Sequence, residues 1–419
     1  MTKFFLIIYN FLFILLLIPF SLIILIFSGK YRKELFFNLP ARFACFESPA
    51  ASKKTIWVHC ASLGEIRAVE PVLENLKKDY FIVLTAVTKT GFEYAQKIRK
   101  ADFVSLLPLD VYPVMRKAFG KIKPVALILV ETEIWVSMIY AAKRSGAKVI
   151  TVNGRMSEKS FVMYNRICFF CGRFINLIDA ILARNADDAK RFELLGASKE
   201  NVSVTGNIKY DRDFSAGTQR KDFGLKDEVF IFSAGSTREG EEEIIAEAYK
   251  KLSVKNPDIK FFLAPRHLVR VKKVKRILEN FGIKYSLFSE LGKDKIEKFV
   301  LVDAFGKLQN IYSVSDVCYV GGSIVNKGGQ NPIEPAAYAK PVLFGKNMGN
   351  FKTESEILLN YGGAFVVSNA DDIASEIERF YSDRDLLNKA GQNALNAVNS
   401  QKGAVNITIQ KLREQLNGK

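Results

Sequence analysis

Short apolar runs that alternate with helical patterns constrain the fold of this 419-residue chain more than any other feature. Each run is rich in β-branched residues and almost unbroken, which is typical of parallel strands covered on both faces. The segments between them, such as 66–76 and 134–144, place apolar residues at helical spacing. The alternation predicts an α/β fold of doubly wound parallel sheets. We expect strands at 55–60, 81–87, 103–107, 125–130, 148–152, 180–183, 229–234, 260–264, 299–302, 317–320, 341–344 and 364–367.

The strand-and-helix pattern stops at one polar stretch, 206–224, and then restarts. Two α/β domains of similar size joined by one linker imply a cleft between them, and ligands of such sheets bind at the carboxyl ends of the strands. The last segment is helical and charged, and it can pack back on the first domain. We therefore divide the chain into an anchor at 1–29, a first Rossmann-like domain at 30–210, a linker at 211–224, a second Rossmann-like domain at 225–395 and a C-terminal helix at 396–419.

The first residues predict a membrane anchor. Residues 4–27 carry no charge, and about 20 apolar residues are enough to cross a bilayer as a helix. The apolar core of a cleaved signal peptide is shorter, about 7–15 residues. Lys30, Arg32 and Lys33 follow at once, which places the body of the protein on the cytoplasmic side.

The net charge of +17 fits nucleic acid, an anionic membrane or an anionic substrate. The predicted anchor favours the last two, so we expect no nucleic-acid partner. The chain has five cysteines and two histidines, and Cys168 and Cys171 form a CxxC without a second pair. Such a set does not support a zinc site. The acidic pair Asp211 and Asp213 lies in the polar linker, so we predict no metal there either.

The glycine-rich stretch 321–348 has the order strand, loop, helix start. The free N–H groups of a helix start near Pro332 favour an anion. A carboxylate such as Glu334 can accept hydrogen bonds from the two hydroxyls of a ribose. A phosphate loop followed by this Glu predicts a nucleotide-sugar site. The alternative is an ordinary glycine-rich turn, because glycine motifs often match by chance.

Acidic residues follow two predicted strands of the first domain. Glu65 stands at a helix start, either as a general base or as a first-turn charge that favours the helix dipole. We expect the helix N-terminus to keep its carboxylate ionised. Glu131 and Glu133 follow a very apolar strand, so at least one of them faces the cleft, unless both are solvated or capping groups. Lys209, beside the linker, suits an anionic substrate.

Two further clusters follow strands of the second domain. Ser236 and Thr237 precede an acidic helix, which predicts a capped helix N-terminus and candidate phosphate contacts. Arg266 and His267 follow the next strand. A lone His is usually a structural residue, and the alternative here is a ligand contact.

Together these clusters resemble one family, the 3-deoxy-D-manno-octulosonic acid (Kdo) transferases of Gram-negative lipid A assembly. The resemblance covers nearly the whole chain, and the combination of motifs is specific although each one is weak. The motifs are, in order, the anchor, HCASLGE, ETEIW, NGRMS, TGNIKYD, GSTREGEEE, APRH, GKL and GGQNPIEPAAYAKPV.

The resemblance implies a GT-B fold and an inverting, metal-independent transfer of Kdo from CMP-Kdo to a lipid A precursor at the bacterial inner membrane. It implies no cofactor, an acceptor-binding first domain and a CMP-sugar-binding second domain. Glu65 resembles the family's general base, and Glu131 and Lys209 resemble its transition-state-stabilising pair. The positions that resemble its CMP contacts are Arg266, His267, Gly306, Lys307, Leu308, Asn331, Pro332, Ile333 and Glu334.

Three positions depart from the family pattern, which usually has an acidic residue in place of Lys307 and often has His in place of Gln330 and Arg238. Two other functions remain open on the residues alone. One is a GT-B enzyme that uses a UDP-sugar, as transferase or epimerase. The other is a membrane-anchored anion-binding protein without catalysis.

Overall fold

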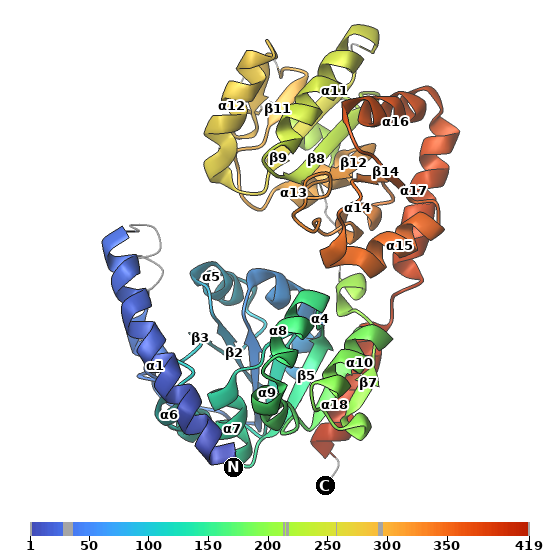
Figure 1. Cartoon of the computed structure of the whole chain (residues 1–419). Helices are drawn as coiled ribbons and strands as arrows, with labels where there is room; N and C mark the ends of the chain where they lie inside the picture. The colour runs from blue at the N-terminus through green and yellow to red at the C-terminus, as the bar shows by residue number, and fades with distance from the viewer. Residues whose placement is uncertain are drawn as a thin grey trace. The chain divides into compact units, whose positions relative to one another are not determined.

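The computed structural model describes residues 2–27, 37–212, 214, 218–256, 258–291 and 296–417, with backbone alone for 17–27. The chain forms two compact units, each with its own parallel sheet (Figure 1). Unit 1 contains Met1–Arg212 and Lys402–Lys419, and unit 2 contains Asp213–Gln401. The predicted α/β class is therefore confirmed.

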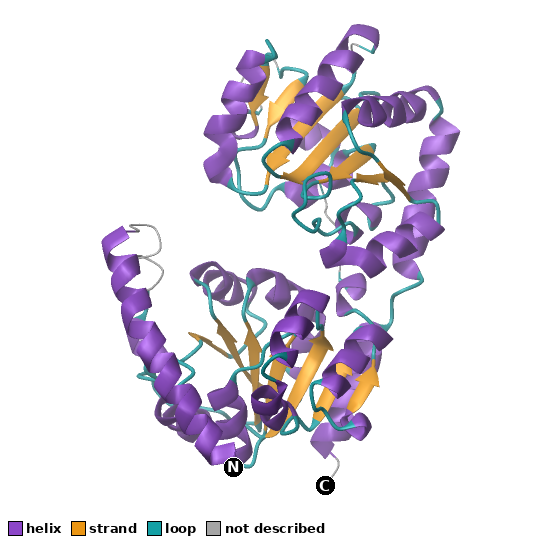
Figure 2. Ribbon diagram, viewed as in Figure 1, coloured by secondary structure: helices purple, strands orange, loops and turns teal. Residues whose placement is uncertain are grey.

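Unit 1 is built on a parallel sheet with the strand order β3-β2-β1-β4-β5-β6-β7 among the described residues. Alternate residues of β1 enter two different cores: Ile56 and Val58 pack with α4 and α5, whereas Trp57 packs with α6 and α7. Helices thus cover both faces of the sheet (Figure 2), as its continuous apolar strands require.

The strands are β1 Thr55–Cys60, β2 Phe81–Ala86, β3 Phe103–Leu106, β4 Ala126–Val130, β5 Lys148–Gly154, β6 Ala180–Ala183 and β7 Val202–Val204. The helices are α3 Leu39–Arg42, α4 Leu63–Leu76, α5 Lys89–Ile98, α6 Tyr112–Ile122, α7 Val136–Arg144, α8 Glu158–Asn165, α9 Cys168–Ile175 and α10 Ala186–Leu194, with short 3-10 turns η1 Lys199–Asn201 and η2 Ile208–Asp211.

Unit 2 repeats this architecture with the order β10-β11-β9-β8-β12-β13-β14, again parallel throughout the described part. Its strands are β8 Ile231–Thr237, β9 Lys260–Pro265, β10 Tyr285–Leu287, β11 Phe299–Leu301, β12 Val317–Val320, β13 Val342–Phe344 and β14 Ala364–Val366. Its helices are α11 Glu241–Lys255, α12 Val271–Asn280, α13 Leu308–Val314, α14 Ile333–Ala336, α15 Lys352–Asn360, α16 Ala370–Ser382 and α17 Arg384–Asn399, with turns η3 Arg220–Phe223, η4 Leu268–Arg270, η5 Phe288–Glu290 and η6 Gly349–Phe351.

Parts of the polar stretch 206–224, from which we predicted a linker, are held within the two units. Phe223 is buried in a core of unit 2, and both carboxylate oxygens of Asp211 accept hydrogen bonds at 2.6 Å, from the N–H groups of Gly403 and Val405. Asp211 therefore holds the start of α18 (Ala404–Asn417), whose apolar face completes a core of unit 1. Asp213 lies outside the described residues.

The first helix, α1 (Thr2–Phe27), is packed against unit 1 along its first turns. Leu6 is buried beside α7 and α9. The Tyr9 hydroxyl donates to Asp110 at 2.7 Å, and the Asn10 side chain accepts from the N–H of Tyr112 at 2.6 Å. Within the described ranges we find no helix with the length and apolar character needed to cross a bilayer. The predicted anchor is thus not confirmed, and its basic flank at 30–33 falls outside the described residues.

Candidate active site

Three strand ends of unit 1 bring the predicted acids together. Glu65 follows β1, Glu131 and Glu133 follow β4, and Lys209 lies in η2, after β7. The negative charges of Glu131 and Glu133 both act on Glu65, and Lys209 forms an ion pair with Glu131. The predicted catalytic residues of the first domain therefore share one edge of one sheet.

Glu65 is held by a reciprocal cap at the start of α4. The Ser62 hydroxyl accepts from the Glu65 N–H at 3.4 Å, while the Glu65 carboxylate accepts from the Ala61 N–H at 2.6 Å and from the Ser62 hydroxyl at 2.8 Å. The Ser62 side chain is thus the N-cap of α4, and the Glu65 carboxylate reaches back to the N–H of the residue before that cap, one position earlier than in a standard capping box. The structural role considered for Glu65 is therefore present in the fold, and it also fixes the orientation of the carboxylate.

The charge of Glu65 differs from our expectation. Burial, with 9% of the residue exposed, raises the pKa of its carboxyl to about 7, and the nearby Glu131 and Glu133 add to the effect. The bonds from Ser62 and Ala61 act in the opposite direction and are outweighed. The helix N-terminus therefore does not keep Glu65 fully ionised at neutral pH, which corrects our prediction. A pKa near the working pH is well suited to a general base.

Glu131 and Lys209 form a mostly buried ion pair, with side chains 12% and 19% exposed. Burial raises the pKa of Glu131, but the Lys209 ammonium and the Arg155 and Arg184 guanidinium groups outweigh burial and lower that pKa below its ordinary value. Glu131 has a left-handed backbone with φ of 65°, a conformation that costs energy for a residue with a side chain. Glu131 is thus an ionised carboxylate at a strained turn, and Lys209 is its ion-pair partner.

Sequence reasoning assigned a catalytic role to Glu131, but it gave no separate role to Glu133 and none to His59. Glu133 accepts a hydrogen bond from the Trp135 indole and lies 3.9 Å from Nε2 of His59. Burial lowers the pKa of His59 to about 3, so the imidazole is neutral and the contact is not an ion pair. Thr85 Oγ1 accepts from the Trp57 indole at 2.9 Å and lies 3.0 Å from Nδ1 of His59. Nδ1 of His59 is thus held by the Thr85 hydroxyl, whereas its buried Nε2 has no hydrogen-bond partner among the described residues.

In unit 2 the strand β8 extends through Ser236 and Thr237, beyond the predicted helix cap. The residue that caps α11 is Gly240, with φ of 94°, and neither hydroxyl caps the helix. Thr237 is fully buried, and its Oγ1 has no hydrogen-bond partner among the described residues. A phosphate could therefore reach Thr237 only if the atoms that bury this side chain moved. Ser236 is half-buried, and its backbone φ is 57°.

A cationic group lies at the ends of β8 and β9. The Arg238 guanidinium contacts Nε2 of His267 at 2.9 Å. Burial lowers the pKa of Arg238, and the charge of Arg266 adds to the effect. Arg266 and His267 are exposed, so their side chains are accessible to a ligand. Arg238, one of the three positions that depart from the family pattern, therefore contacts the predicted CMP-binding residue His267 directly.

The other predicted CMP contacts lie at or just before the starts of α13 and α14, two helices that pack against each other. Gly306 and Lys307 are exposed at the start of α13, and Leu308 is half-buried. The charge of Glu334 acts on the buried Tyr312 hydroxyl of α13, so the two helices bring these positions together. Asn331 and Glu334 are half-buried, whereas Pro332 and Ile333 are buried.

Two features of the predicted phosphate loop differ from expectation. Helix α14 is a single turn, and Asn331 Oδ1 already accepts from the N–H of Ile333 at 3.1 Å, so little helix dipole remains for an anion. The N–H groups of Gly322, Ser323 and Ile324 all donate to the carboxylate of Glu241. Glu241 had no predicted role, because three consecutive acids at a helix start look like ordinary first-turn charges.

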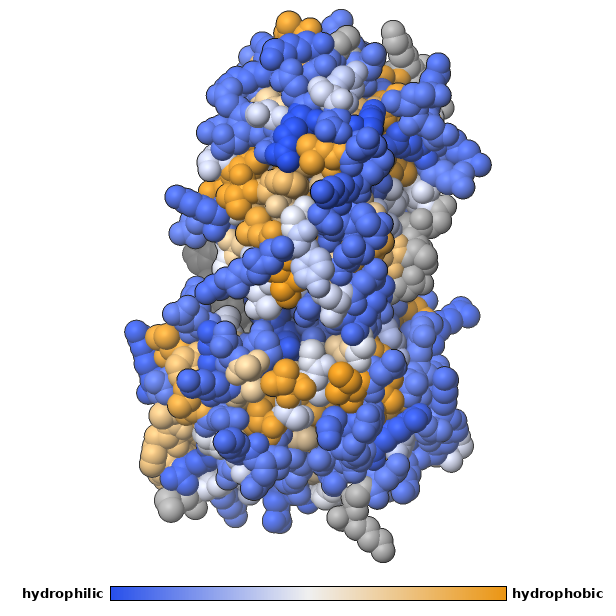
Figure 3. Space-filling model, turned by 90° about the vertical axis from the view of Figure 1, so that its right-hand side faces the viewer, coloured by the Kyte–Doolittle hydropathy of each residue, from blue (hydrophilic) through white to orange (hydrophobic). Residues whose placement is uncertain are grey.

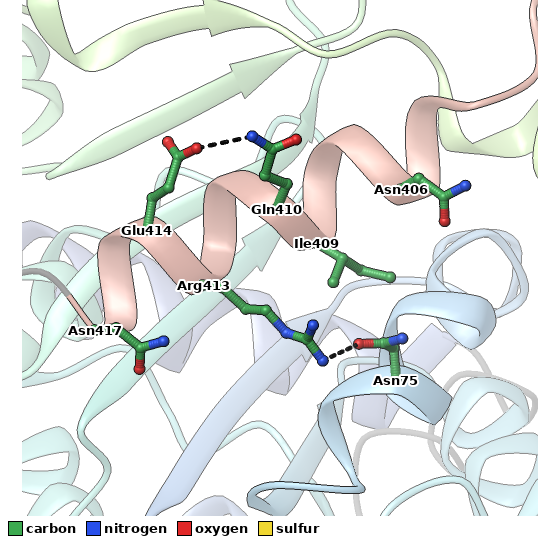
Figure 4. A pocket seen from close by; sticks show the side chains of 7 residues that line it. All are labelled: Asn75, Asn406, Ile409, Gln410, Arg413, Glu414 and Asn417. Atoms are coloured by element: carbon green, nitrogen blue, oxygen red, sulfur yellow. Dashed lines mark hydrogen bonds between the residues drawn. The ribbon is translucent and has the colours of Figure 1, made fainter.

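One hollow of unit 1 lies away from these residues, between α18 and the end of α4. This hollow is open to solvent and has a volume of about 760 Å³. Along it Arg413 donates to Asn75 and Gln410 donates to Glu414 (Figure 4). None of the predicted site residues lines it. The face shown in Figure 3 is mainly hydrophilic, with hydrophobic residues in small patches.

Among the described residues, no group of three or more His, Cys, Asp or Glu side chains is arranged to hold a metal ion. All five cysteines are free; Cys45 and Cys168 are exposed, and the other three are buried. The acids at the site are instead partnered by Lys209, by indole and hydroxyl donors and by backbone N–H groups.

Known proteins are similar to this chain across most of its length. A protein-family model described as 3-deoxy-D-manno-octulosonic-acid transferase (kdotransferase) matches residues 38–212. A Haemophilus influenzae 3-deoxy-D-manno-octulosonic acid transferase is 30% identical, covering 93% of both chains. The Aquifex aeolicus enzyme of that name is 33% identical over 83% of this chain and 91% of its own length. The match to a Fusobacterium nucleatum bifunctional glycosyltransferase/methyltransferase, 32% identical over 88% of this chain, spans only 59% of that protein.

Solved structures support the fold independently. A UDP-GlcNAc 2-epimerase from Neisseria meningitidis matches 87% of this chain and all of its own, with a TM-score of 0.62 and 14% identity. A glycosyltransferase from Rickettsia africae matches 88% of this chain and 99% of its own, with a TM-score of 0.60 and 17% identity. These likenesses show the fold alone, two parallel-sheet α/β domains like those of GT-B glycosyltransferases. With relatives of 30% and 33% identity covered almost end to end, the chain belongs to the 3-deoxy-D-manno-octulosonic acid (Kdo) transferase family.

Proposed function

We propose that this Kdo transferase moves Kdo from CMP-Kdo to a sugar hydroxyl of a lipid A precursor, with inversion and without a metal ion. Kdo transfer in lipopolysaccharide biosynthesis follows from its family. The observation that carries the detailed mechanism is Glu65, a positioned carboxyl whose pKa is raised to about 7, beside the ion pair of Glu131 and Lys209.

The base has a defined task in this reaction. A sugar hydroxyl is a poor nucleophile, so Glu65 takes its proton while the oxygen attacks the anomeric carbon of Kdo. The bond from that carbon to the phosphate oxygen breaks, and CMP leaves with the electron pair. General-base help of this kind is typically worth ~10²–10⁴-fold. The cap on Glu65 fixes the carboxylate before substrate arrives, which preserves the alignment that catalysis needs.

Charged groups of the protein can stabilise this transition state without a metal. Lys209 supplies a positive charge whose position Glu131 fixes, and such preorganised charge is effective because it does not reorganise during the reaction. Arg238 and Arg266 in unit 2 are cations suited to the phosphate of CMP, and Glu334 is suited to the ribose hydroxyls. Unit 1 thus carries the base, and unit 2 carries the donor-binding groups.

We propose that the protein works at the cytoplasmic face of the inner membrane and contacts lipid through α1. One side of this helix exposes Phe4, Ile7, Phe11, Ile14 and Leu15, between 44% and 65% each. A continuous apolar side of this size is typical of surfaces that meet lipid or protein. The basic residues at 30–33 favour the cytoplasmic side. Confining enzyme and acceptor to one surface raises their effective concentration.

Purified protein incubated with CMP-Kdo and a lipid A precursor tests the function directly. Mass spectrometry of the lipid should show one or more added Kdo residues, and activity should persist in EDTA. UDP-sugars should be neither donors nor epimerisation substrates. A lipid of unchanged mass under conditions where CMP binds would contradict the transfer, and activity that disappears in EDTA and returns with Mg²⁺ would contradict the metal-independent mechanism.

A further inference from the structure

Glu241 is the first residue of α11, and its carboxylate is fully buried. Both oxygens are used: Oε1 accepts three hydrogen bonds and Oε2 accepts two, at 2.7 to 3.1 Å. No ammonium or guanidinium group is among these five donors. They are the backbone N–H groups of Arg238, Gly322, Ser323 and Ile324 and the hydroxyl of Tyr319.

The arrangement requires an acceptor at both oxygens, because all five partners donate. Three successive N–H groups, from Gly322 to Ile324, converge on this one carboxylate. Convergent backbone N–H groups of this kind form an anion-binding concavity, the device by which many glycine loops hold phosphate. Here the concavity is already filled by an anion of the protein itself. These three N–H groups are therefore not available to a nucleotide phosphate.

The same contacts fix the path of the loop that leads to the predicted donor-binding residues. Beyond the concavity the loop closes on itself, since the Gly329 N–H donates to the Gly322 carbonyl at 2.8 Å. Gly322 and Gly329 both have φ of 73°, a conformation that favours glycine. Two residues after this closure the chain reaches Asn331, and Glu334 follows on α14. The position of the Asn331–Glu334 segment thus depends on where Glu241 holds the base of the loop.

We propose that Glu241 is a positioning residue for donor binding: its carboxylate replaces a ligand anion in the loop and places Asn331 and Glu334 for the nucleoside of CMP. The inference rests on the proposed donor-binding role of these two residues. In this proposal the glycine loop positions other residues and does not bind the donor phosphate itself. Side-chain cations bind that phosphate.

Glu241→Gln tests the proposal with little change in shape. The amide keeps one acceptor oxygen but presents an NH₂ group to backbone N–H donors, so part of the anchoring is lost. Asp316→Asn is the matched control. Its carboxylate accepts from the Ile231 N–H at 2.7 Å and from Arg220 at 2.8 Å, at the opposite end of β8 and β12.

Three measurements on full-length protein separate positioning from general destabilisation. Hydrogen exchange of a peptide covering 321–332 should lose its protection in Glu241→Gln and keep it in Asp316→Asn. Calorimetric titration with CMP should show at least tenfold weaker binding in Glu241→Gln alone. Steady-state kinetics should show a higher KM for CMP-Kdo, with kcat and the acceptor KM within about threefold of wild type.

A CMP Kd within threefold of wild type in Glu241→Gln, or an equal change in both variants, would overturn the proposal. If Glu241→Gln does not fold, Tyr319→Phe removes one of the five donors and keeps the carboxylate; it should increase exchange at 322–324 and weaken CMP binding several-fold, and unchanged values would again contradict the proposal. Wild-type protein that neither binds CMP nor transfers Kdo would instead contradict the proposed function, and the exchange experiment would still show whether Glu241 fixes the loop.

Discussion

Glu131 and Lys209 are 78 residues apart in the sequence and form one ion pair at the edge of the first sheet. The turn after β4 presents the carboxylate, and η2 presents the ammonium. Both elements are fixed by hydrogen bonds to β5: the Glu131 N–H donates to the Val152 carbonyl, and the Ile208 N–H donates to the side-chain Oδ1 of Asn153. The pair is therefore positioned by β5, which lies next to β4 in the sheet.

Replacing Lys209 by Met should affect both catalysis and stability. Loss of one partner leaves Glu131 charged and mostly buried, which costs about 3 kcal/mol of unfolding free energy. Lys209 is the first of the cations that lower the pKa of Glu131 below its ordinary value of 4.5. The pair therefore stabilises the fold at pH values above 4.5, and this stabilisation is lost as the pH falls through the lowered pKa. Urea unfolding should thus show a larger loss at pH 7 than at pH 4, and kcat should fall ~10²-fold.

Lys143→Met is the control for this prediction. Lys143 pairs with Asp179 at 2.6 Å in the same unit, with both side chains about one-third exposed. We expect a loss of less than ~1 kcal/mol for an exposed pair and normal turnover. Equal effects of the two substitutions on kcat would exclude a specific role for Lys209.

Glu65→Gln should reduce kcat by ~10²-fold or more, because it removes the base. Gln keeps an oxygen that can accept from the Ala61 N–H or the Ser62 hydroxyl, so the melting temperature should change little. Both quantities are measured on one preparation. Glu74→Gln, an exposed change on the same helix, should alter neither. Turnover of Glu65→Gln within threefold of wild type would leave Glu65 as a helix cap only.

The pH dependence of activity should report the same carboxyl. Glu65 must be ionised to act, so kcat/KM should rise with pH and level off above an apparent pKa near 7. Its contribution to stability has the opposite sign: a folded pKa raised above 4.5 stabilises at low pH, and this effect is lost as pH rises through 7. Glu133→Gln removes a negative neighbour and should move the midpoint of the activity profile to lower pH. An unmoved midpoint would indicate that another group titrates.

Glu334→Ala should weaken CMP binding about tenfold, because ribose hydroxyls left without partners cost roughly 1–3 kcal/mol. The acceptor KM should not change. Glu376→Ala, on α16 of the same unit and paired with Arg379, controls for loss of surface charge. Calorimetric titration with CMP measures both, and normal CMP affinity of Glu334→Ala would reduce this residue to a part of the short helix α14.

Tyr9→Phe should loosen α1 from unit 1. The substitution removes a donor to Asp110, whose pKa burial raises to about 6. A hydrogen bond to a charged group is worth about 1.5–3 kcal/mol, so the loss of stability should be greater at pH 8, where Asp110 is ionised, than at pH 5. Urea unfolding at the two pH values measures the difference. A loss that does not depend on pH would mean that the hydroxyl contributes by packing.

The sequence predicted the parts of this fold that depend on local pattern. The apolar runs identified the strands of both sheets except β7 and β10, in which a serine interrupts the apolar residues (VSV and YSL). The predicted acids of the first domain do share one edge of the sheet. Local pattern was sufficient here because parallel strands place all their carboxyl ends on one side.

The remaining features depend on register and burial, which a sequence does not display. His59 lies opposite Thr85 in the pairing of β1 with β2, and only that register gives the imidazole its orientation toward Glu133. The pKa of Glu65 depends on how deeply the carboxyl is buried. Glu241 is the first of three consecutive acids, and only the packing of β12 against β8 shows that it faces inward.

The return of α18 to unit 1 has a consequence for synthesis on the ribosome. Residues 1–212 emerge first, yet the core of unit 1 lacks Ala404, Val405, Ile409 and Leu412 until the end of the chain appears. Roughly 190 residues must be translated in between, which takes about 10–40 s at usual bacterial rates. Unit 2 is continuous and can complete its fold during this time. The part of the enzyme that is made first is therefore finished last, and the core residues that these four side chains cover stay exposed until α18 is made.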